Sequence, residues 1–252
     1  MKVLILPDEQ SASLYIARLV KKEIEAKADL RLGLTPCDQL WPCYQHLVEF
    51  DNRKEISFHQ VRFFATDEFV GYGPDNPLSN AFFLWSRFLC RLDLKKENVF
   101  LLNGAASNPA SECIAYENIL KKVGGVDLGV VGLGIRGEVG RNEPSSSLGS
   151  RCRIKILDPM ELERDGRFSM HSSHPISSLT VGVATLMAAR KIILVALGGG
   201  RAMAIARALE GPLTSMVTAS VFQRHPDCTV VLDREATIHL KKKNAYEEIN
   251  AT

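Results

Sequence analysis

Short apolar runs that alternate with helical patterns along the whole chain constrain the fold more than any other feature of the sequence. The runs predicted as strands are 2–6, 30–34, 61–66, 98–102, 126–132, 153–157, 191–197 and 228–232. Helical spacing of apolar side chains marks the segments near 9–26, 38–50, 78–90, 111–123, 201–209 and 218–223. Several strands are apolar throughout, which is typical of a parallel sheet covered on both faces. The pattern predicts one doubly wound α/β domain over residues 1–252 with a mostly parallel sheet.

Charge and hydropathy exclude several function classes. The net charge of +2 over 252 residues gives no support for binding to nucleic acid or to a membrane surface. No apolar run approaches the ~20 residues that a membrane-spanning helix needs. The start of the chain, MKVLILPDEQ, is too short and too soon acidic for a secretory signal. We therefore expect a protein that works in the cytoplasm without a membrane or nucleic-acid partner.

The cysteines predict neither a disulfide framework nor a metal site. None of the six forms a C-x-x-C pair or has zinc-like spacing with histidine. Cys37 and Cys43 are close in sequence, but two cysteines alone do not favour a disulfide or a metal role. We expect six free, buried thiols in a reducing compartment.

Ligands in open α/β sheets bind outside the carboxyl ends of the strands. This rule selects the loops that follow Leu34, Thr66, Gly132 and Leu197 as the candidate site. The longest irregular stretch is the polar segment 158–178, and long loops in compact domains often have a function. We expect that segment to act as a lid.

The loop after Gly132 reads GLGIRGEVGRNEP and has the spacing of a dinucleotide-binding fingerprint. Asp158 follows at the distance expected of a ribose-binding acid. The fingerprint requires a helix to begin at the loop, since its N-terminus holds the pyrophosphate. Here further glycines, a proline and a serine cluster follow, and they do not propagate a helix. A dinucleotide is the disfavoured alternative, and no cofactor is predicted.

Segment 132–157, GLGIRGEVGRNEPSSSLGSRCRIKIL, resembles the active-site loop of the glucosamine-6-phosphate deaminases (isomerases), relatives of the 6-phosphogluconolactonases. Other segments resemble the family in order, namely ATDEFVG at 65–71, LLNG at 101–104, LTVGVATLMAA at 179–189, ALEGPLT at 208–214 and TASVFQRHPDCTVVLD at 218–233. The resemblance implies a Rossmann-like sheet and chemistry without a metal or an organic cofactor. It also implies a homo-oligomer. Assembly with an active paralogue is the alternative expectation, for a chain that has itself lost activity.

The family reaction opens the ring of a hexosamine 6-phosphate, moves a proton between C2 and C1, and releases ammonia to give fructose 6-phosphate. It needs a carboxylate base, an acid–base group for ring opening and a phosphate cradle. By the resemblance, Asp67 is the proton-shuttling carboxylate and Glu143 is a further catalytic acid. The alternative for Asp67 is a side chain that caps the next turn.

The ring-opening group differs from the family pattern. The family has histidine at the position of Glu138 and aspartate at the position of Arg136. Imidazole gives and takes a proton near neutral pH, whereas an ordinary glutamate titrates near ~4.3. A cation at Arg136 favours the charged carboxylate further. The pair Arg136 and Glu138 therefore predicts lost or altered chemistry.

The phosphate cradle is altered as well. The family segment L-G-L-P-T-G-G-T-P corresponds to LGLTPCDQL at 32–40, with Cys37 and Asp38 in place of the glycines. Glycines let backbone N–H groups approach a phosphate closely, and Asp38 is expected to bring a negative charge towards it. Arg167 and Arg201 match the family's phosphate-contacting cations, and the alternative for both is a solvated surface position.

A second phosphate site is suggested by Ser146, Arg153 and Lys155. They match residues that bind an N-acetylated amino-sugar phosphate at a regulatory site in some family members. Serine hydroxyls with cationic side chains suit a phosphate. The alternative is a serine-rich turn followed by an ordinary amphipathic strand.

Two hypotheses follow from these residues. In the first, the chain is a catalytically impaired homologue that binds glucosamine 6-phosphate or N-acetylglucosamine 6-phosphate. In the second, it is an active isomerase, deaminase or related hydrolase with a changed substrate, which uses Asp67 with Glu138 or Glu143.

Overall fold

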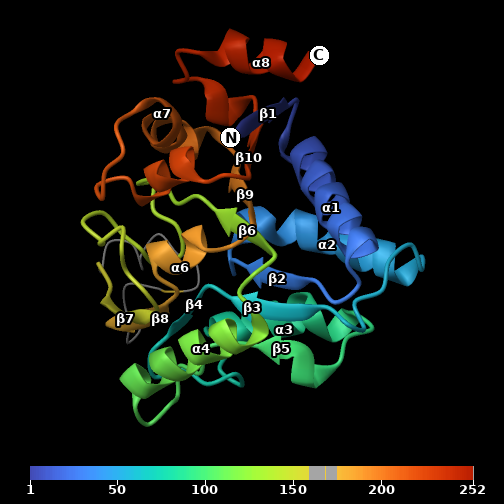
Figure 1. Cartoon of the computed structure of the whole chain (residues 1–252), viewed down its shortest axis with the longest axis vertical. Helices are drawn as coiled ribbons and strands as arrows, with labels where there is room; N and C mark the ends of the chain where they lie inside the picture. Colours follow the sequence, from blue (N-terminus) through green and yellow to red (C-terminus); the bar gives the residue numbers. More distant parts are fainter. Residues whose placement is uncertain (159–167, 169–174, 252) are drawn as a thin grey trace.

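A seven-stranded parallel sheet forms the centre of the molecule in the computed structural model, which describes residues 1–158, 168 and 175–251 (Figure 1). Its strand order is β1-β10-β9-β6-β2-β3-β5, and a second sheet has the order β4-β8-β7. The strands are β1 Lys2–Leu6, β2 Arg31–Leu34, β3 Arg62–Ala65, β4 Asp67–Phe69, β5 Val99–Phe100, β6 Leu128–Gly132, β7 Arg153–Ile156, β8 Ser177–Thr180, β9 Lys191–Ala196 and β10 Cys228–Asp233.

Helices cover both faces of the main sheet (Figure 1). The α-helices are α1 Glu9–Ala26, α2 Trp41–Asn52, α3 Asn80–Arg87, α4 Pro109–Val123, α6 Val183–Met187, α7 Ala202–Glu210 and α8 Lys243–Ala251. The 3₁₀ helices are Asp38–Leu40, Leu89–Arg91, Lys96–Asn98, Gly199–Arg201, Thr218–Arg224 and Glu235–Thr237. Helices α1, α2 and α3 pack in one apolar cluster, whereas α4, α6 and α7 pack in the other. The predicted doubly wound, Rossmann-like α/β fold is therefore confirmed.

The ends of the helices follow local sequence signals. The Asp8 side chain accepts the N–H of Ser11 and caps α1. Asn108 caps α4 in the same way, and Pro109 occupies the first helical position, where no N–H is needed. None of the helices in the described part of the chain is long and apolar enough to cross a membrane.

The second sheet departs from the simple alternation that the sequence predicts. The strand predicted at 153–157 forms β7, but it pairs antiparallel with β8 outside the main sheet. Strands β4 and β8 were not expected, because DEF and SSLT carry polar residues in runs too short to show a pattern. β4 begins at Asp67, directly after Thr66 and the end of β3, so one extended segment crosses from the main sheet into the second.

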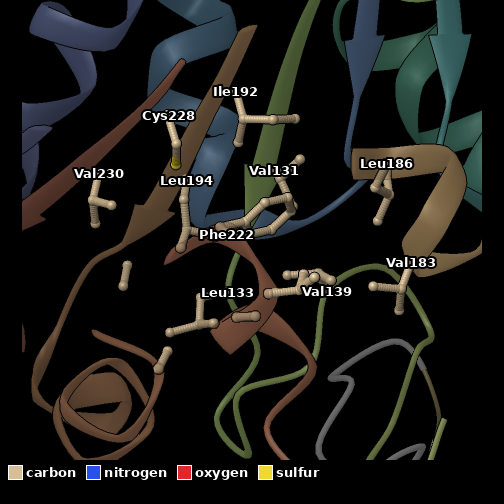
Figure 2. Close-up of a cluster of buried hydrophobic side chains, with 14 of the residues drawn as sticks. Val131, Leu133, Val139, Val183, Leu186, Ile192, Leu194, Phe222, Cys228 and Val230 are labelled. Carbon is tan, nitrogen blue, oxygen red and sulfur yellow. The ribbon is translucent and has the colours of Figure 1, made fainter. Parts of the chain in front are cut away.

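The apolar cluster on the α4 side reaches into the loop that follows β6 (Figure 2). Leu133 and Val139 are fully buried and face each other across an isolated β-bridge. In Figure 2 they lie beside Phe222, below Val131 and Leu194 of the sheet. Burial of these two side chains anchors both ends of the glycine-containing loop to the core.

At the opposite, amino end of the strands, three cationic side chains contact the carboxylate of Asp127. Arg31 donates to it from its backbone N–H, from Nε at 2.8 Å and from Nη2. Lys27 Nζ donates at 2.5 Å, and Arg190 Nη1 lies 3.4 Å away. Burial raises the pKa of Asp127, but the hydrogen bonds from Arg31 and Lys27 outweigh it and hold that pKa well below its usual range. Gly124 leaves room for the guanidinium, because a Cβ there would lie 2.5 Å from Arg31 Nη1.

All six cysteines are free thiols, in agreement with the sequence prediction. Their predicted burial is wrong in part, since Cys90 is exposed and Cys37 and Cys152 are only partly buried. Cys90 lies in the 3₁₀ helix Leu89–Arg91, in which Leu89 is the residue that faces the core, so Cys90 faces outward.

Candidate functional site

Loops from four neighbouring strands meet at the carboxyl edge of the main sheet. Gln39, after β2, donates from Nε2 to the carbonyl of Leu133, after β6, at 3.0 Å. Arg201, after β9, donates from Nε to the same carbonyl at 2.9 Å. Arg141, also after β6, lies 3.4 Å from the carboxylate of Asp67, after β3. The four loops selected from the sequence are therefore brought together.

Asp67 is buried and held by side chains rather than by the backbone. Thr66 Oγ1 donates to its Oδ1 at 2.7 Å, and Asn80 Nδ2 donates to its Oδ2 at 2.7 Å. Its neighbour Glu68, by contrast, accepts backbone groups, namely the N–H of Phe69 in β4 and those of Asn80 and Ala81 at the start of α3. The N-cap of α3 itself is Ser79. Asp67 thus presents a positioned carboxylate at the strand end, as a proton-shuttling base requires.

Glu68 is a titratable group beside the site that the sequence did not single out. It is 2% exposed, and burial raises its pKa to about 7 against the effect of the backbone N–H groups that it accepts. Asp67 next to it raises the pKa further. The only sequence signal is its place beside Asp67 in TDEF, which carries no information on burial.

The turn after β6 has the shape that its glycines predict. Gly134 donates its N–H to the carbonyl of Glu138, and Gly137 donates to the carbonyl of Gly134. Gly137 has a φ of 87°, and a Cβ there would meet Val217 at 2.5 Å. Both conditions favour glycine at that position. The turn is anchored at its ends by Leu133 and Val139 (Figure 2).

The Glu138 side chain folds back over its own turn. Its Oε2 accepts the backbone N–H of Arg136 at 2.9 Å. A Cβ built on Gly134 would lie only 1.7 Å from Glu138 Oε1. The carboxylate thus fills the space that Gly134 leaves open and closes the turn from inside.

Arg136 directs its guanidinium towards two other acids. Nη1 lies 3.2 Å from Asp158, and Nη2 lies 3.9 Å from Glu143. Lys155 Nζ lies 3.5 Å from the other oxygen of Glu143, which is 7% exposed. The acid Glu143, retained from the family pattern, is therefore held between two cations.

Arg141 is a site residue that the sequence analysis missed. Its guanidinium lies beside Asp67 and 4.7 Å above the ring of Phe69, and its N–H donates to Thr180. The available signal was its place in GRNEP, where the family loop has phenylalanine. The substitution brings a cation to the buried carboxylate that the resemblance assigns as the base.

The loop after β2 is filled by its own groups. The N–H of Cys37 donates to the carbonyl of Thr35, and Pro36 has no N–H. A Cβ on Gly132 would meet Cys37 Sγ at 2.7 Å and Gln39 Nε2 at 2.8 Å. Burial raises the pKa of the Cys37 thiol to about 12, so it stays neutral. Side chains therefore pack where the family pattern has glycine.

The position expected for the Asp38 side chain is wrong. Its carboxylate was expected to approach the phosphate position, but its side chain is 82% exposed and pairs with Arg87 at 3.5 Å. The reason is local, because Asp38 begins a 3₁₀ helix whose buried residues are Gln39 and Leu40. Asp38 therefore faces outward.

Of the two arginines predicted to bind phosphate, the structure describes Arg201 but not Arg167. Arg201 ties loops together, with Nε on the carbonyl of Leu133 and Nη1 on the carbonyl of Leu197, each at 2.9 Å. Arg167 lies outside the described residues, as does most of the predicted lid 158–178. Gly198, with a φ of 81°, begins the turn that carries Arg201.

Ser146, Arg153 and Lys155 gather around the turn that follows Asn142. Arg153 Nη1 donates to Asn142 Oδ1 at 2.8 Å, and Lys155 pairs with Glu143. Ser146 is 6% exposed, and its Oγ has no hydrogen-bond partner within the described residues. Arg153 and Lys155 thus contact the candidate catalytic loop itself rather than a separate region.

The amino-acid sequence of the chain is similar to those of known proteins. The family model described as glucosamine-6-phosphate isomerases/6-phosphogluconolactonase matches residues 9–139. A glucosamine-6-phosphate deaminase of Thermoanaerobacter pseudethanolicus is 37% identical over 94% of this chain and 94% of its own length. The chain belongs to this family. A glucosamine-6-phosphate deaminase of Dictyostelium discoideum is 38% identical over 96% of this chain and 95% of its own length.

Solved structures of the family share the fold. A monomeric glucosamine-6-phosphate deaminase superposes with a TM-score of 0.91 at 31% identity, covering 94% of this chain and 98% of that one. The 6-phosphogluconolactonase of Trypanosoma cruzi gives a TM-score of 0.76 at 18% identity, with 95% of this chain and 97% of that one covered. The second likeness concerns the fold alone.

The filled loop after β2 gives a prediction for stability. Gly132→Ala is expected to lower the free energy of unfolding by about 1–3 kcal/mol, because the added methyl overpacks against Cys37 and Gln39. In a Cys37→Gly/Gln39→Ala background the same substitution should cost less than about 1 kcal/mol, because neighbouring changes are not additive. Urea unfolding of the four proteins measures both values. Equal losses in the two backgrounds would mean that these side chains do not fill the loop.

Proposed function

We propose that this chain is a sugar-phosphate-binding member of the family that has lost most of the deaminase chemistry. One observation carries the proposal. The carboxylate of Glu138, at the position of the family's ring-opening histidine, closes its own turn over Gly134 and accepts the N–H of Arg136. A side chain held inside a turn is poorly placed to exchange protons with a bound sugar.

The charges around the other acids support the same proposal. Arg141 pairs with Asp67, and Arg136 and Lys155 pair with Glu143. A base must approach the substrate C–H directly, and a cation at its oxygen competes for that position. Glucosamine 6-phosphate also brings an ammonium group, which two nearby guanidinium groups repel.

Sugar-phosphate binding is supported by the cations that remain. Arg201 stands at the start of α7 with two of its nitrogens on carbonyls. Arg153, Lys155 and the buried hydroxyl of Ser146 surround one turn. These groups suit glucosamine 6-phosphate or its N-acetylated analogue. A cytoplasmic location and assembly with itself or with an active paralogue stay predictions.

The second candidate function is an active isomerase, deaminase or related hydrolase with a changed substrate. It is favoured by Asp67, which Thr66 and Asn80 position at the strand end, and by the retained Glu143. In that case Glu138 or Glu143 would act as the acid. If Glu138 is that acid, Glu138→Ala should abolish turnover of the substrate.

Both candidates are tested by one assay with a binding arm. The protein, purified from a host without its own deaminase, is given glucosamine 6-phosphate with and without the N-acetylated analogue, and ammonia and fructose 6-phosphate are measured. We expect turnover at least ~10³-fold below that of the Thermoanaerobacter pseudethanolicus relative assayed in parallel, since a positioned acid–base group contributes 10²–10⁴-fold. Turnover within ~10-fold of that relative would favour the active enzyme.

The binding arm measures thermal stabilisation by each sugar phosphate, with unphosphorylated glucosamine as the control. A ligand at about 100 times its Kd should raise the Tm by roughly 5–10 °C. Arg201→Ala should reduce this rise, whereas Arg207→Ala, on the exposed face of α7, should leave it unchanged. No stabilisation by either sugar phosphate would refute the binding role.

A further inference from the structure

A cavity of about 240 Å³ opens beside the C-terminal half of α4, and none of its lining residues belongs to the candidate site. Its walls come from α4, from the turn that follows this helix, from α6 and from Arg151. The volume is smaller than that of a typical pocket for a drug-sized ligand, so the cavity suits a molecule of few atoms.

Backbone contacts hold the segment of Arg151 against α6. The hydroxyl and the carbonyl of Ser150 accept the N–H groups of Val183 and Ala184, respectively, at the start of that helix. A Cβ on Gly182 would lie only 2.4 Å from the carbonyl oxygen of Arg151. Only glycine allows this close approach, so the wall that carries Arg151 has a fixed position.

Glu117 places a negative charge in the wall of the cavity, although the residue is only 9% exposed. Its Oε1 accepts the N–H of Cys152 at 2.8 Å and the hydroxyl of Thr185. Among the described residues, none donates to Oε2, and no cationic side chain forms an ion pair with the carboxylate. Buried charges in proteins are normally paired. Glu117 therefore lacks the positive partner that its burial favours.

Two cationic side chains line the same cavity. Lys121 stands one helical turn after Glu117, and Arg151 lies in the wall described above. Both are exposed, and within the described part of the chain neither side chain forms a hydrogen bond or an ion pair. A guanidinium binds both oxygens of a carboxylate, and an ammonium adds a further donor. A carboxylate-binding position thus lies in the same cavity as the unpaired Glu117.

The rest of the cavity wall is apolar. It includes Leu120, which is 5% exposed, together with Val126 and Ala188. Leu120 and Val126 also line a second, mostly apolar cavity of about 30 Å³. Gly125 lines the larger cavity, and a Cβ there would meet nothing within 4 Å. A small aliphatic group therefore has both room and apolar contacts.

We infer that this cavity binds a small aliphatic α-amino acid. The ammonium group of the ligand pairs with Glu117, its carboxylate pairs with Arg151 and Lys121, and its side chain lies against Leu120 and Val126. A simple anion would be repelled by Glu117, and a simple cation would be repelled by the two basic side chains. A zwitterion with a short apolar side chain matches all three parts of the wall. The inference does not depend on the sugar-phosphate site.

Isothermal titration of the full chain with L-valine tests the inference. We expect saturable binding with a Kd below ~1 mM, a modest affinity for so small a ligand. Three matched probes each lack one part of valine. Isovalerate has no ammonium group, isobutylamine has no carboxylate, and glycine has no aliphatic side chain. Each should bind at least ~10-fold more weakly than L-valine, because each loses one of the three contacts.

Variants assign each contact to its residue. Glu117→Gln keeps the shape of the side chain and should remove the preference for L-valine over isovalerate. Arg151→Ala, at an exposed position where folding is not at risk, should remove the preference for L-valine over isobutylamine. Lys122→Ala is the matched control, because Lys122 is an exposed cation next to Lys121 that does not line the cavity. It should bind L-valine as the parent protein does.

Three results would overturn the inference. The first is the absence of saturable binding of L-valine to the parent protein. The second is binding of isovalerate, isobutylamine or glycine as tight as that of L-valine. The third is unchanged binding of L-valine in Arg151→Ala, which would place the ligand elsewhere on the molecule.

Discussion

Ammonia release from glucosamine 6-phosphate is expected to stay at background when Arg136→Asp and Glu138→His are combined. The two changes restore the ring-opening pair of the family pattern. They leave the filled loop at Cys37 and Gln39, and they leave Arg141 on the carboxylate of Asp67. A restored acid–base group does not raise the rate of ammonia release while the substrate phosphate is not held and Asp67 is paired with a cation.

Turnover should appear only when these obstacles are removed together. Adding Cys37→Gly, Gln39→Ala and Arg141→Phe to the double variant should raise ammonia release by at least ~10²-fold over the double variant, the lower range for general acid–base catalysis. The coupled assay for ammonia and fructose 6-phosphate measures the rates, and thermal unfolding shows that each variant folds.

A further substitution provides the control for this series. Asp67→Asn in the fully substituted protein should return turnover to background, because the amide cannot take the substrate proton. A gain of ~10²-fold in the double variant alone would contradict the prediction. It would mean that the loop after β2 already holds the phosphate and that Arg141 does not obstruct Asp67.

Asp127→Asn is expected to lower the free energy of unfolding by about 3–5 kcal/mol, because it leaves the buried Arg31 guanidinium without its partner. This is a large part of the 5–15 kcal/mol that stabilises a typical domain. Asp29→Asn is the matched control. Asp29 pairs with Lys27 at 3.5 Å but its side chain is 57% exposed, so the expected loss is below ~1 kcal/mol.

The same cluster predicts a dependence on pH. The hydrogen bonds from Arg31 and Lys27 hold the pKa of Asp127 below the usual value of an aspartate in the folded protein. Its stabilising contribution is therefore complete above about pH 4 and is lost as the pH falls towards the folded pKa. Urea unfolding between pH 7 and pH 3 should show a steeper loss in the parent protein than in Asp127→Asn. Parallel curves would contradict the assignment.

The main sheet and the place of the site could be predicted from the sequence for clear reasons. Buried parallel strands are apolar throughout, so KIILVA and LGVVG stand out in the chain. The carboxyl ends of such strands share one edge, which is why the loops after Leu34 and Gly132 were expected to meet. Strands such as SSLT in β8 carry no such signal, because their pairing comes from β4 and β7.

The direction of individual side chains could not be predicted. The sequence pointed to Asp38 as a charge near the phosphate, but its 3₁₀ helix turns it towards Arg87. Nothing in the segment GRNEP predicts a partner for Arg141, yet its guanidinium lies 3.4 Å from the carboxylate of Asp67. In each case the outcome depends on partners that are far away in sequence.

The sequence by itself determined the α/β class, the family resemblance and the positions where the catalytic pattern is broken, because periodicity and residue identity are local properties. Only the tertiary structure decided that Glu138 closes its own turn and that Arg141 pairs with Asp67. These contacts join residues whose distances depend on how the loops pack on the core. Packing responds to the shape and charge of all neighbours at once, and a linear pattern of residue types does not contain that information.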